Sequence, residues 1–201
     1  MSVHADFPVC LRLQGKRVLL IGGGRIAEAR AKQLVDAGAD VRVICSEATS
    51  TLNELAQEGR LRLEERPYAS GDLSGHHAVL VATNDRKVSQ AVAAEARMRG
   101  IWINTADEPD LCDFTLPSVG RRGFITVAVS TSGHAPALAA RLQRELTAFI
   151  SSDHLRRAQL SAWLRRRLPR GEQRSGVLRR IADLARPLHP REEAFGPGEH
   201  E

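Results

Sequence analysis

Residues 22–27 read GGGRIA, which has the GxGxxA spacing of a dinucleotide-binding turn. In such a turn Gly22 permits a tight bend, Gly24 lets a pyrophosphate approach the backbone, and Ala27 allows a helix to pack closely on a strand. The apolar run 17–21 precedes the turn and a helical pattern follows it, so the N–H groups of a helix N-terminus would face the ligand. The alternative is a glycine turn that binds nothing, but the strand–turn–helix context favours a cofactor site.

The acidic residue that binds the ribose usually stands about 20 residues beyond the glycines, at the end of the second strand. That place reads Ile44-Cys45-Ser46-Glu47 here, so either Ser46 or a backbone group takes this role, with Glu47 as the acidic candidate. No arginine follows immediately to bind a 2′-phosphate, which favours NAD over NADP.

A polar triplet, Thr83-Asn84-Asp85, follows the apolar run at residues 78–82 and is expected at the sheet edge where cofactors bind in such folds. Asn84 or Asp85 can alternatively cap a helix, and the two roles are compatible. These patterns together predict one set of NAD-binding residues: Gly22, Gly23, Gly24, Arg25, Ile26, Ser46, Glu47, Thr83 and Asn84.

A second polar stretch, residues 104–109, follows the apolar run that begins at Ile101. Asp107 in this stretch can face the reactive end of the cofactor and act as a general base. The alternative is a loop carboxylate that caps a turn or binds water.

Hydroxyl residues and glycine gather in the segment Ser130-Thr131-Ser132-Gly133-His134-Ala135-Pro136, between a predicted strand and a predicted helix. Such a segment at a helix N-terminus suits an anion, although an ordinary helix cap has the same composition. His134 can exchange protons near neutral pH, or it is simply solvated.

The histidines and cysteines do not form a metal-binding pattern. His76 and His77 are adjacent, so they lack the i, i+4 spacing that places two ligands on one helix face. Cys10, Cys45 and Cys112 lie far apart without CxxC spacing, which argues against a disulfide framework and against structural zinc. We therefore predict no permanent metal and a reducing, cytoplasmic location.

Apolar strands and amphipathic helices alternate through the first half of the chain. Strands are predicted at residues 17–21, 41–45, 61–65, 78–82 and 101–104, and helices at residues 25–37, 52–58 and 85–99. This alternation implies a parallel sheet covered on both faces, and right-handed crossovers make it a doubly wound, Rossmann-type α/β fold.

The pattern changes after residue 107. Two β-rich runs, residues 114–119 and 124–130, are joined by Gly120-Arg121-Arg122-Gly123 and predict a β-hairpin. Helices are predicted at residues 136–150, 153–168 and 174–185, the first with Leu138, Leu142 and Leu146 spaced by four. The expected division is an NAD-binding domain at 1–112, a segment at 113–150, and a helical C-terminal region at 151–201 that frays from residue 187.

The chain of 201 residues has a net charge of +5 and a pI near 9.7. Residues 151–201 hold 11 arginines against seven acidic residues, so the basic excess belongs to the C-terminal region. A basic surface suits a polyanionic small molecule as well as nucleic acid, and the region has few aromatic side chains to stack on bases. No apolar run approaches the roughly 18–20 residues of a membrane-spanning helix, and the N-terminus lacks the features of a secretory signal. Neither nucleic acid nor a membrane is therefore a predicted partner.

In this order, the motifs resemble the precorrin-2 dehydrogenase/sirohydrochlorin ferrochelatase family, the siroheme-forming module. Five stretches carry the resemblance: Phe7-Pro8-Val9 with Leu11 and Gly15, VLLIGGGRIAEARAKQL at the glycine turn, VATND at 81–85, INTADEPDLCDFTLPSV at 103–119 and VAVSTSGHAPALAARLQREL at 127–146. The last two are far more specific than the glycine turn. The resemblance covers residues 1–150 well and the helical remainder loosely.

The resemblance implies that NAD⁺ accepts a hydride from precorrin-2 to give sirohydrochlorin, and that in some members the same cavity inserts Fe²⁺, as a substrate, to make siroheme. The family's catalytic aspartate falls on Asp107 and its substrate-contacting asparagine on Asn104. Its serine/glycine turn falls on residues 130–136, which makes substrate-binding candidates of Ser130, Thr131, Ser132 and His134. The sequence departs from the family here, with Ser132 where glycine is common and His134 where lysine or a small polar residue is common.

The resemblance also implies a homodimer that exchanges the segment after the nucleotide domain, which makes residues 113–150 a dimerisation and substrate segment. The substrate of the family is a polycarboxylate tetrapyrrole, for which Arg121, Arg122 and the basic helices can supply cations. Fused family members carry a C-terminal methyltransferase. Because 201 residues leave no room for it, we expect a separate uroporphyrinogen methyltransferase upstream in the pathway.

Two other classes of function stay open at this point. A regulatory domain that senses NAD(H) without chemistry would share residues 15–110, but it would not need the NTAD loop or the STSGHAP turn. A nucleic-acid-binding role for the arginine-rich helices is the third reading. Whether iron insertion occurs is not decided by the sequence.

Overall fold

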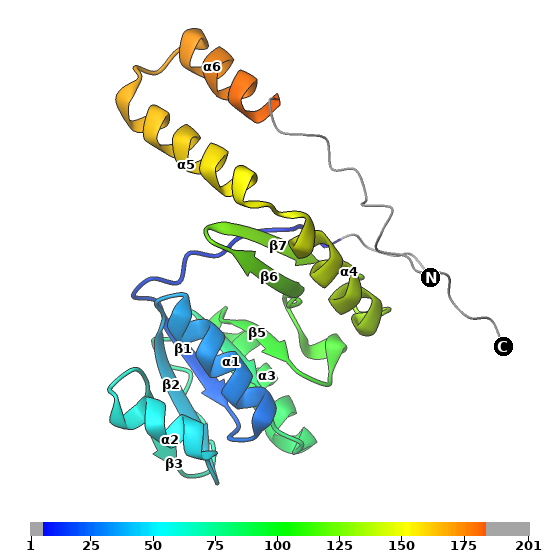
Figure 1. Cartoon of the computed structure of the whole chain (residues 1–201). Helices are drawn as coiled ribbons and strands as arrows, with labels where there is room; N and C mark the ends of the chain where they lie inside the picture. The colour runs from blue at the N-terminus through cyan, green and yellow to red at the C-terminus, as the bar shows by residue number, and fades with distance from the viewer. Residues whose placement is uncertain (1–5, 184–201) are drawn as a thin grey trace, which may run out of the picture. The chain divides into compact units, whose positions relative to one another are not determined.

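The predicted strands form one five-stranded sheet in a computed structural model that describes residues 6–183 (Figure 1). All its pairings are parallel, in the order β3-β2-β1-β4-β5. The strands are β1 (Arg17–Ile21), β2 (Asp40–Cys45), β3 (Arg62–Glu65), β4 (Ala78–Val81) and β5 (Trp102–Thr105). The order reverses between β1 and β4, so the doubly wound fold predicted from the sequence is confirmed.

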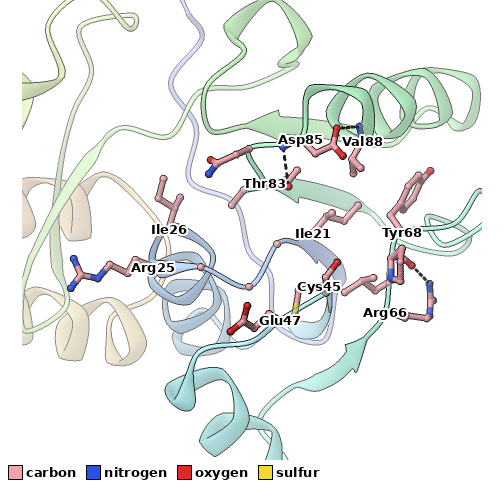
Figure 2. A pocket seen from close by; sticks show the side chains of 18 residues that line it. Ile21, Arg25, Ile26, Cys45, Glu47, Arg66, Tyr68, Thr83, Asp85 and Val88 are labelled. Atoms are coloured by element: carbon pink, nitrogen blue, oxygen red, sulfur yellow. Dashed lines mark hydrogen bonds between the residues drawn. The ribbon is translucent and has the colours of Figure 1, made fainter.

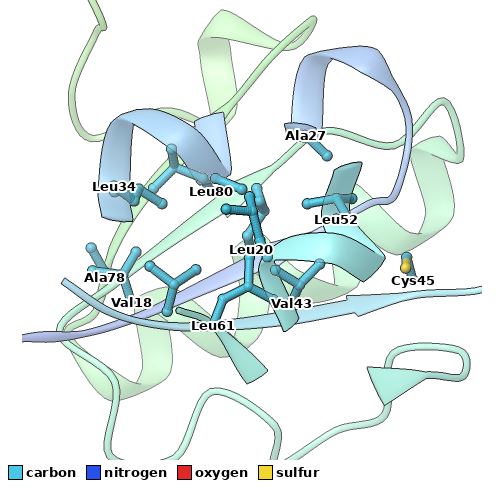
Figure 3. Close-up of a cluster of buried hydrophobic side chains, with 13 residues drawn as sticks. Val18, Leu20, Ala27, Leu34, Val43, Cys45, Leu52, Leu61, Ala78 and Leu80 are labelled. Carbon is cyan, nitrogen blue, oxygen red and sulfur yellow. The ribbon is translucent and has the colours of Figure 1, made fainter. Parts of the chain in front are cut away.

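Three helices cover the two faces of this sheet, namely α1 (Arg25–Asp36), α2 (Ser50–Gln57) and α3 (Arg86–Arg99). Side chains alternate along each strand, so Val18 and Leu20 of β1 pack under α1 and α2, as Figure 3 shows, whereas Leu19 and Ile21 pack under α3. All four are buried, and complete burial of one such side chain contributes about 1.5–3 kcal/mol. These two layers of core fix the strands and therefore the loops that follow them.

The strand register brings the carboxyl ends of the strands to one edge of the sheet. Ile21, the last residue of β1, pairs with Ile44 of β2 and with Val81 of β4. Val81 in turn pairs with Thr105, the last residue of β5. The segments that follow these strands therefore begin beside one another.

The chain divides into two compact units, one ending at Leu116 and the other beginning at Pro117. The second unit contains the antiparallel strands β6 (Ser118–Arg122) and β7 (Ile125–Val129), followed by α4 (Pro136–Phe149), α5 (Ser152–Arg167) and α6 (Glu172–Asp183). The fraying predicted from residue 187 onwards lies outside the described residues. Within residues 6–183 no helix is both long and apolar enough to cross a membrane.

The hairpin is present, but its turn lies further along the chain than the sequence predicted. Arg122 pairs with Ile125, so the turn consists of Gly123 and Phe124, and Gly120 lies inside β6. Gly123 has φ +58°, which suits the first position of a two-residue turn. A Cβ atom on Gly120 would overlap the side chains of Gln143 and Thr147 on α4, so this glycine serves close packing of the helix rather than the turn.

Helix α4 packs one face against the hairpin and leaves another face exposed. Ala139 is buried, and Gln143 and Thr147 face Gly120. Leu138, Leu142 and Leu146 are 49%, 37% and 43% exposed. The predicted leucine row therefore exists as a half-exposed apolar stripe, which we call the leucine stripe.

Candidate functional site

A cavity of about 900 Å³ lies at the carboxyl edge of the five-stranded sheet (Figure 2). We call it the edge cavity, because residues that follow β1, β2, β3 and β4 line it. All nine residues predicted to bind a cofactor are among its lining residues. Ile26 is half-exposed and lines this cavity, whereas Ala27 and Ala31 of the same helix are buried under it.

The three glycines of the turn differ in what surrounds them. Gly22 has φ +124°, and a Cβ atom there would overlap the carbonyl of Ala82. A Cβ atom on Gly23 would overlap the carbonyl oxygen of Glu47. Gly24, in contrast, has no atom within 4 Å of the place of a Cβ. The first two glycines are thus required by the fold, and the third leaves the space into which a pyrophosphate fits.

Helix α1 begins at this open position without a side-chain cap. Gly24 is its N-cap residue, in extended conformation, and no side chain among residues 6–183 accepts a hydrogen bond from the first N–H groups of the helix. The N-terminus of a helix offers unpaired donors and a partial positive charge, which is the chemistry that binds phosphate. The residues present therefore fit the pyrophosphate of a dinucleotide.

The triplet after β4 both caps a helix and lines the edge cavity. The Asp85 carboxylate accepts hydrogen bonds from the N–H groups of Lys87 (2.9 Å) and Val88 (3.3 Å), so Asp85 is the N-cap of α3. The Thr83 hydroxyl accepts the Asp85 N–H at 3.2 Å. Figure 2 shows Thr83 and Asp85 at the edge cavity, where the capping role is present and binding of the cofactor by the triplet stays a prediction.

At the end of β2, Ser46 and Glu47 are exposed and line the edge cavity, as expected for residues near a ribose. Cys45 beside them is buried, and burial raises the pKa of its thiol, so the group stays protonated at neutral pH. Cys10, Cys45 and Cys112 are all free thiols. No group of three or more His, Cys, Asp or Glu side chains suited to a metal ion occurs between residues 6 and 183.

A further wall of the edge cavity consists of Arg66, Pro67 and Tyr68, which the sequence motifs did not indicate. Arg66 forms an ion pair of 2.6 Å with Asp72, and this hydrogen-bonded partner lowers the pKa of the Asp72 carboxyl. Arg66, Pro67 and Tyr68 could have been predicted from their position directly after β3, because this strand ends at the same edge of the sheet.

Asp107 is exposed on the loop that follows β5. The Ala106 N–H donates to the carbonyl of Val81 at 2.9 Å and extends the β4–β5 ladder by one residue. The loop is held by its neighbours: the Thr105 hydroxyl donates to the carbonyl of Glu108 at 2.5 Å, and the Thr105 N–H donates to the Cys112 sulfur at 3.1 Å. A carboxylate is thus presented at the same sheet edge as the edge cavity, although it is not one of the residues that line it.

Asn104, the predicted substrate contact, is almost buried in this structure. Its amide donates to the carbonyl of Phe114 at 2.9 Å, and the Asp113 carboxylate accepts the N–H of Ile103 at 3.0 Å. These two hydrogen bonds hold residues 113–114 against β5. The structure therefore gives Asn104 a role in holding the loop that carries Asp107, and its contact with substrate stays a prediction.

The other substrate candidates lie together in the second unit, in the turn between β7 and α4. The Ser130 hydroxyl accepts the N–H of Ser132 at 3.1 Å, and the Thr131 hydroxyl accepts the N–H of Ala135 at 3.1 Å. The His134 ring nitrogen Nδ1 lies 3.0 Å from the carbonyl oxygen of Thr131. Ser132 has φ +49°, a left-handed conformation that favours glycine.

Comparison with known proteins assigns the class. Residues 9–118 match the family described as "Putative NAD(P)-binding", and the chain belongs to this family. The matched region contains the whole edge cavity and Asp107.

Among individual relatives, siroheme synthase of Methylococcus capsulatus is 40% identical over 161 residues, which cover 80% of this chain and 34% of that protein. Siroheme synthase of Pseudomonas entomophila is 40% identical over 158 residues, 79% of this chain and 34% of that protein. The chain thus spans about a third of the length of these curated relatives. A solved structure named "SirC, precorrin-2 dehydrogenase" matches with a TM-score of 0.74 and 26% identity over 90% of both chains. The resemblance read from the motifs is confirmed.

Proposed function

We propose that this chain dehydrogenates precorrin-2 to sirohydrochlorin with NAD⁺, in the cytoplasm, on a substrate supplied by a uroporphyrinogen methyltransferase. The observation that carries the proposal is the match over 90% of both chains to a precorrin-2 dehydrogenase. The fold supports it by presenting the Asp107 carboxylate at the same sheet edge as a glycine-lined cavity.

We assign the following roles to the residues. The backbone at Gly24 and the N-terminus of α1 bind the pyrophosphate, and Ser46 and Glu47 contact the adenosine ribose. Bound NAD⁺ supplies the hydride acceptor. Asp107 takes the proton that the substrate loses when the hydride leaves, so that two electrons and two hydrogens are removed together.

The substrate is a polycarboxylate, so we assign its recognition to cations and hydrogen-bond donors outside the edge cavity. Arg121 and Arg122 are exposed on β6, and neither forms an ion pair in the described part of the chain. Guanidinium groups bind carboxylates in bidentate geometry. Asn104, Ser130, Thr131, Ser132 and His134 remain the other proposed substrate contacts.

The relatives named siroheme synthase favour a second activity, insertion of Fe²⁺ as a substrate to give siroheme. In this reaction a carboxylate accepts the pyrrole N–H protons as iron enters the ring. We assign that step to the exposed carboxylate of Asp107.

One experiment on the purified protein tests both activities. Precorrin-2 with NAD⁺ should yield NADH and sirohydrochlorin, and sirohydrochlorin with Fe²⁺ should yield siroheme, each followed by absorbance; NADP⁺ is compared in the first reaction. Binding of NAD⁺ without turnover of precorrin-2 would instead identify a cofactor-sensing domain.

We propose further that the chain is a homodimer in which the leucine stripe is covered. Leu142→Asp is expected to give a monomer in light scattering, because the substitution would bury an unpaired charge at the contact. Arg141→Ala on the same helix is the matched control, since the exposed Arg141–Glu145 pair contributes little. A folded Leu142→Asp protein that remains a dimer would place the contact elsewhere.

A further inference from the structure

Helix α3 carries a buried carboxylate, Glu95, that none of the roles proposed above uses. The residue is only 2% exposed, although a glutamate is almost never fully buried unless it is paired. It faces the loop that follows β3 and contains Tyr68. A carboxylate in this position needs partners for both oxygens.

Glu95 has three such partners. The Tyr68 hydroxyl donates to Oε2 at 2.5 Å, the Gly71 N–H donates to Oε2 at 2.9 Å, and the Arg99 Nε donates to Oε1 at 2.7 Å. Burial by itself raises the pKa of the Glu95 carboxyl, but these donors outweigh it and hold the pKa below its usual value. The group is therefore an anion at neutral pH, bound to two points of one loop.

Tyr68 is the point at which this loop meets the cofactor site. It lines the edge cavity, and it also lines a second hollow of about 410 Å³ along α3, together with Lys87, Ala91 and Met98. The tyrosine side chain thus separates the two spaces, and Figure 2 shows it at the rim of the edge cavity near Val88. If the hydroxyl lost its acceptor, the side chain could turn toward the hollow and the wall would open.

The position of Tyr68 in the sheet order indicates which part of a dinucleotide it meets. Gly24 receives the pyrophosphate at β1, and Ser46 and Glu47 follow β2 on the adenosine side. Tyr68 follows β3, the next strand outward, whereas Asp107 follows β5 at the opposite edge. The tyrosine wall therefore belongs to the adenosine end and not to the reacting end.

We propose that Glu95 is a positioning residue of the cofactor site, which holds Tyr68 and Gly71 so that the loop after β3 forms a fixed wall against the adenosine end of the dinucleotide. This role rests on the cofactor site of the proposed function. In this role α3 supports a wall of the edge cavity in addition to covering the sheet.

The test uses variants that change the anchor in different ways. Glu95→Gln keeps the shape but removes the anionic acceptor, and Tyr68→Phe keeps the ring but removes the donor. Since a hydrogen bond to a charged group is among the stronger ones, each should weaken binding of NAD⁺ and of ADP-ribose about tenfold. The double variant should be little worse than either single one, because both remove the same contact. The kcat at saturating NAD⁺ should stay near that of the wild type.

Two control variants separate positioning from folding. Arg99→Ala removes the third partner of Glu95, and Met98→Ala alters only the second hollow; neither residue lines the edge cavity. Both should leave the Kd for ADP-ribose unchanged in calorimetry, whatever they do to the melting temperature. A purely structural role of Glu95 predicts the reverse pattern, in which melting temperatures fall and the Kd of the folded fraction does not move.

The outcomes distinguish the two proposals. Wild-type binding of ADP-ribose with unchanged affinity in Glu95→Gln and Tyr68→Phe would overturn the role of Glu95 alone. Failure of the wild-type protein to bind NAD⁺ and ADP-ribose would overturn the proposed function and the role of Glu95 with it.

Discussion

Asp107→Asn is expected to slow the NAD⁺-dependent conversion of precorrin-2 by about 10²–10⁴-fold, the usual loss when a general base is removed. Asparagine has the same shape as aspartate but cannot accept the proton. The loop should keep its course, because Thr105 and Cys112 make the hydrogen bonds that hold it. Affinity for NAD⁺ should therefore match that of the wild-type protein.

The matched control for this prediction is Asp110→Asn, which removes an exposed carboxylate of the same loop and should leave the rate unchanged. Initial rates are measured for both variants, with NAD⁺ affinity determined separately by calorimetry. If iron insertion occurs, it should fall together with dehydrogenation in the Asp107 variant. Near wild-type dehydrogenation would remove Asp107 from the mechanism, and loss of only one activity would show that the two reactions use different bases.

Gly24→Asp should abolish binding of NAD⁺ while the protein stays folded. A Cβ atom at this position would meet no atom within 4 Å, and Gly24 has φ −83°, so the substitution does not strain the backbone. Aspartate is also a favourable N-cap residue, and its carboxylate can accept hydrogen bonds from the first N–H groups of α1. It would thereby occupy the site of the pyrophosphate with a negative charge, and electrostatic repulsion would add to the loss of space.

Two further variants show whether the charge or the shape of the new side chain is responsible for the loss of NAD⁺ binding. Gly24→Asn adds a side chain of similar size without the charge and should retain more affinity than Gly24→Asp. Gly23→Ala should instead lower the melting temperature, because its Cβ would overlap the carbonyl oxygen of Glu47. Unchanged NAD⁺ affinity of Gly24→Asp in calorimetry would contradict the placement of the pyrophosphate at this turn.

The parts of the fold that the sequence predicted well are those set by local periodicity. The run from β1 through the glycine turn to α1 and β2 was predictable because buried strands are continuously apolar and Gly38 ends the helix pattern. The doubly wound arrangement followed from the handedness of crossovers. The nine cofactor candidates line one cavity because the strand ends of a parallel sheet meet at one edge.

What the sequence could not predict depends on contacts between distant segments. Gly120 looked like a turn residue, yet Gln143 and Thr147 of α4 require a glycine there inside the strand. The hydrogen bond from the Asn104 amide to the carbonyl of Phe114 joins residues ten positions apart, and no local pattern indicated it. Tyr68 was missed because its place at the cavity depends on Glu95, 27 positions further along the chain.

The uncapped start of α1 links cofactor supply to the lifetime of the folded chain. The helices α2, α3 and α5 receive caps from Thr49, Asp85 and Ser151, but in the part of the chain that the structure describes the first N–H groups of α1 lack a side-chain acceptor. A dinucleotide bound at Gly24 supplies that acceptor, so its binding energy adds to the stability of the fold, by about 2.7 kcal/mol when its concentration is a hundred times Kd. Depletion of the dinucleotide would raise the fraction of unfolded chains open to proteases.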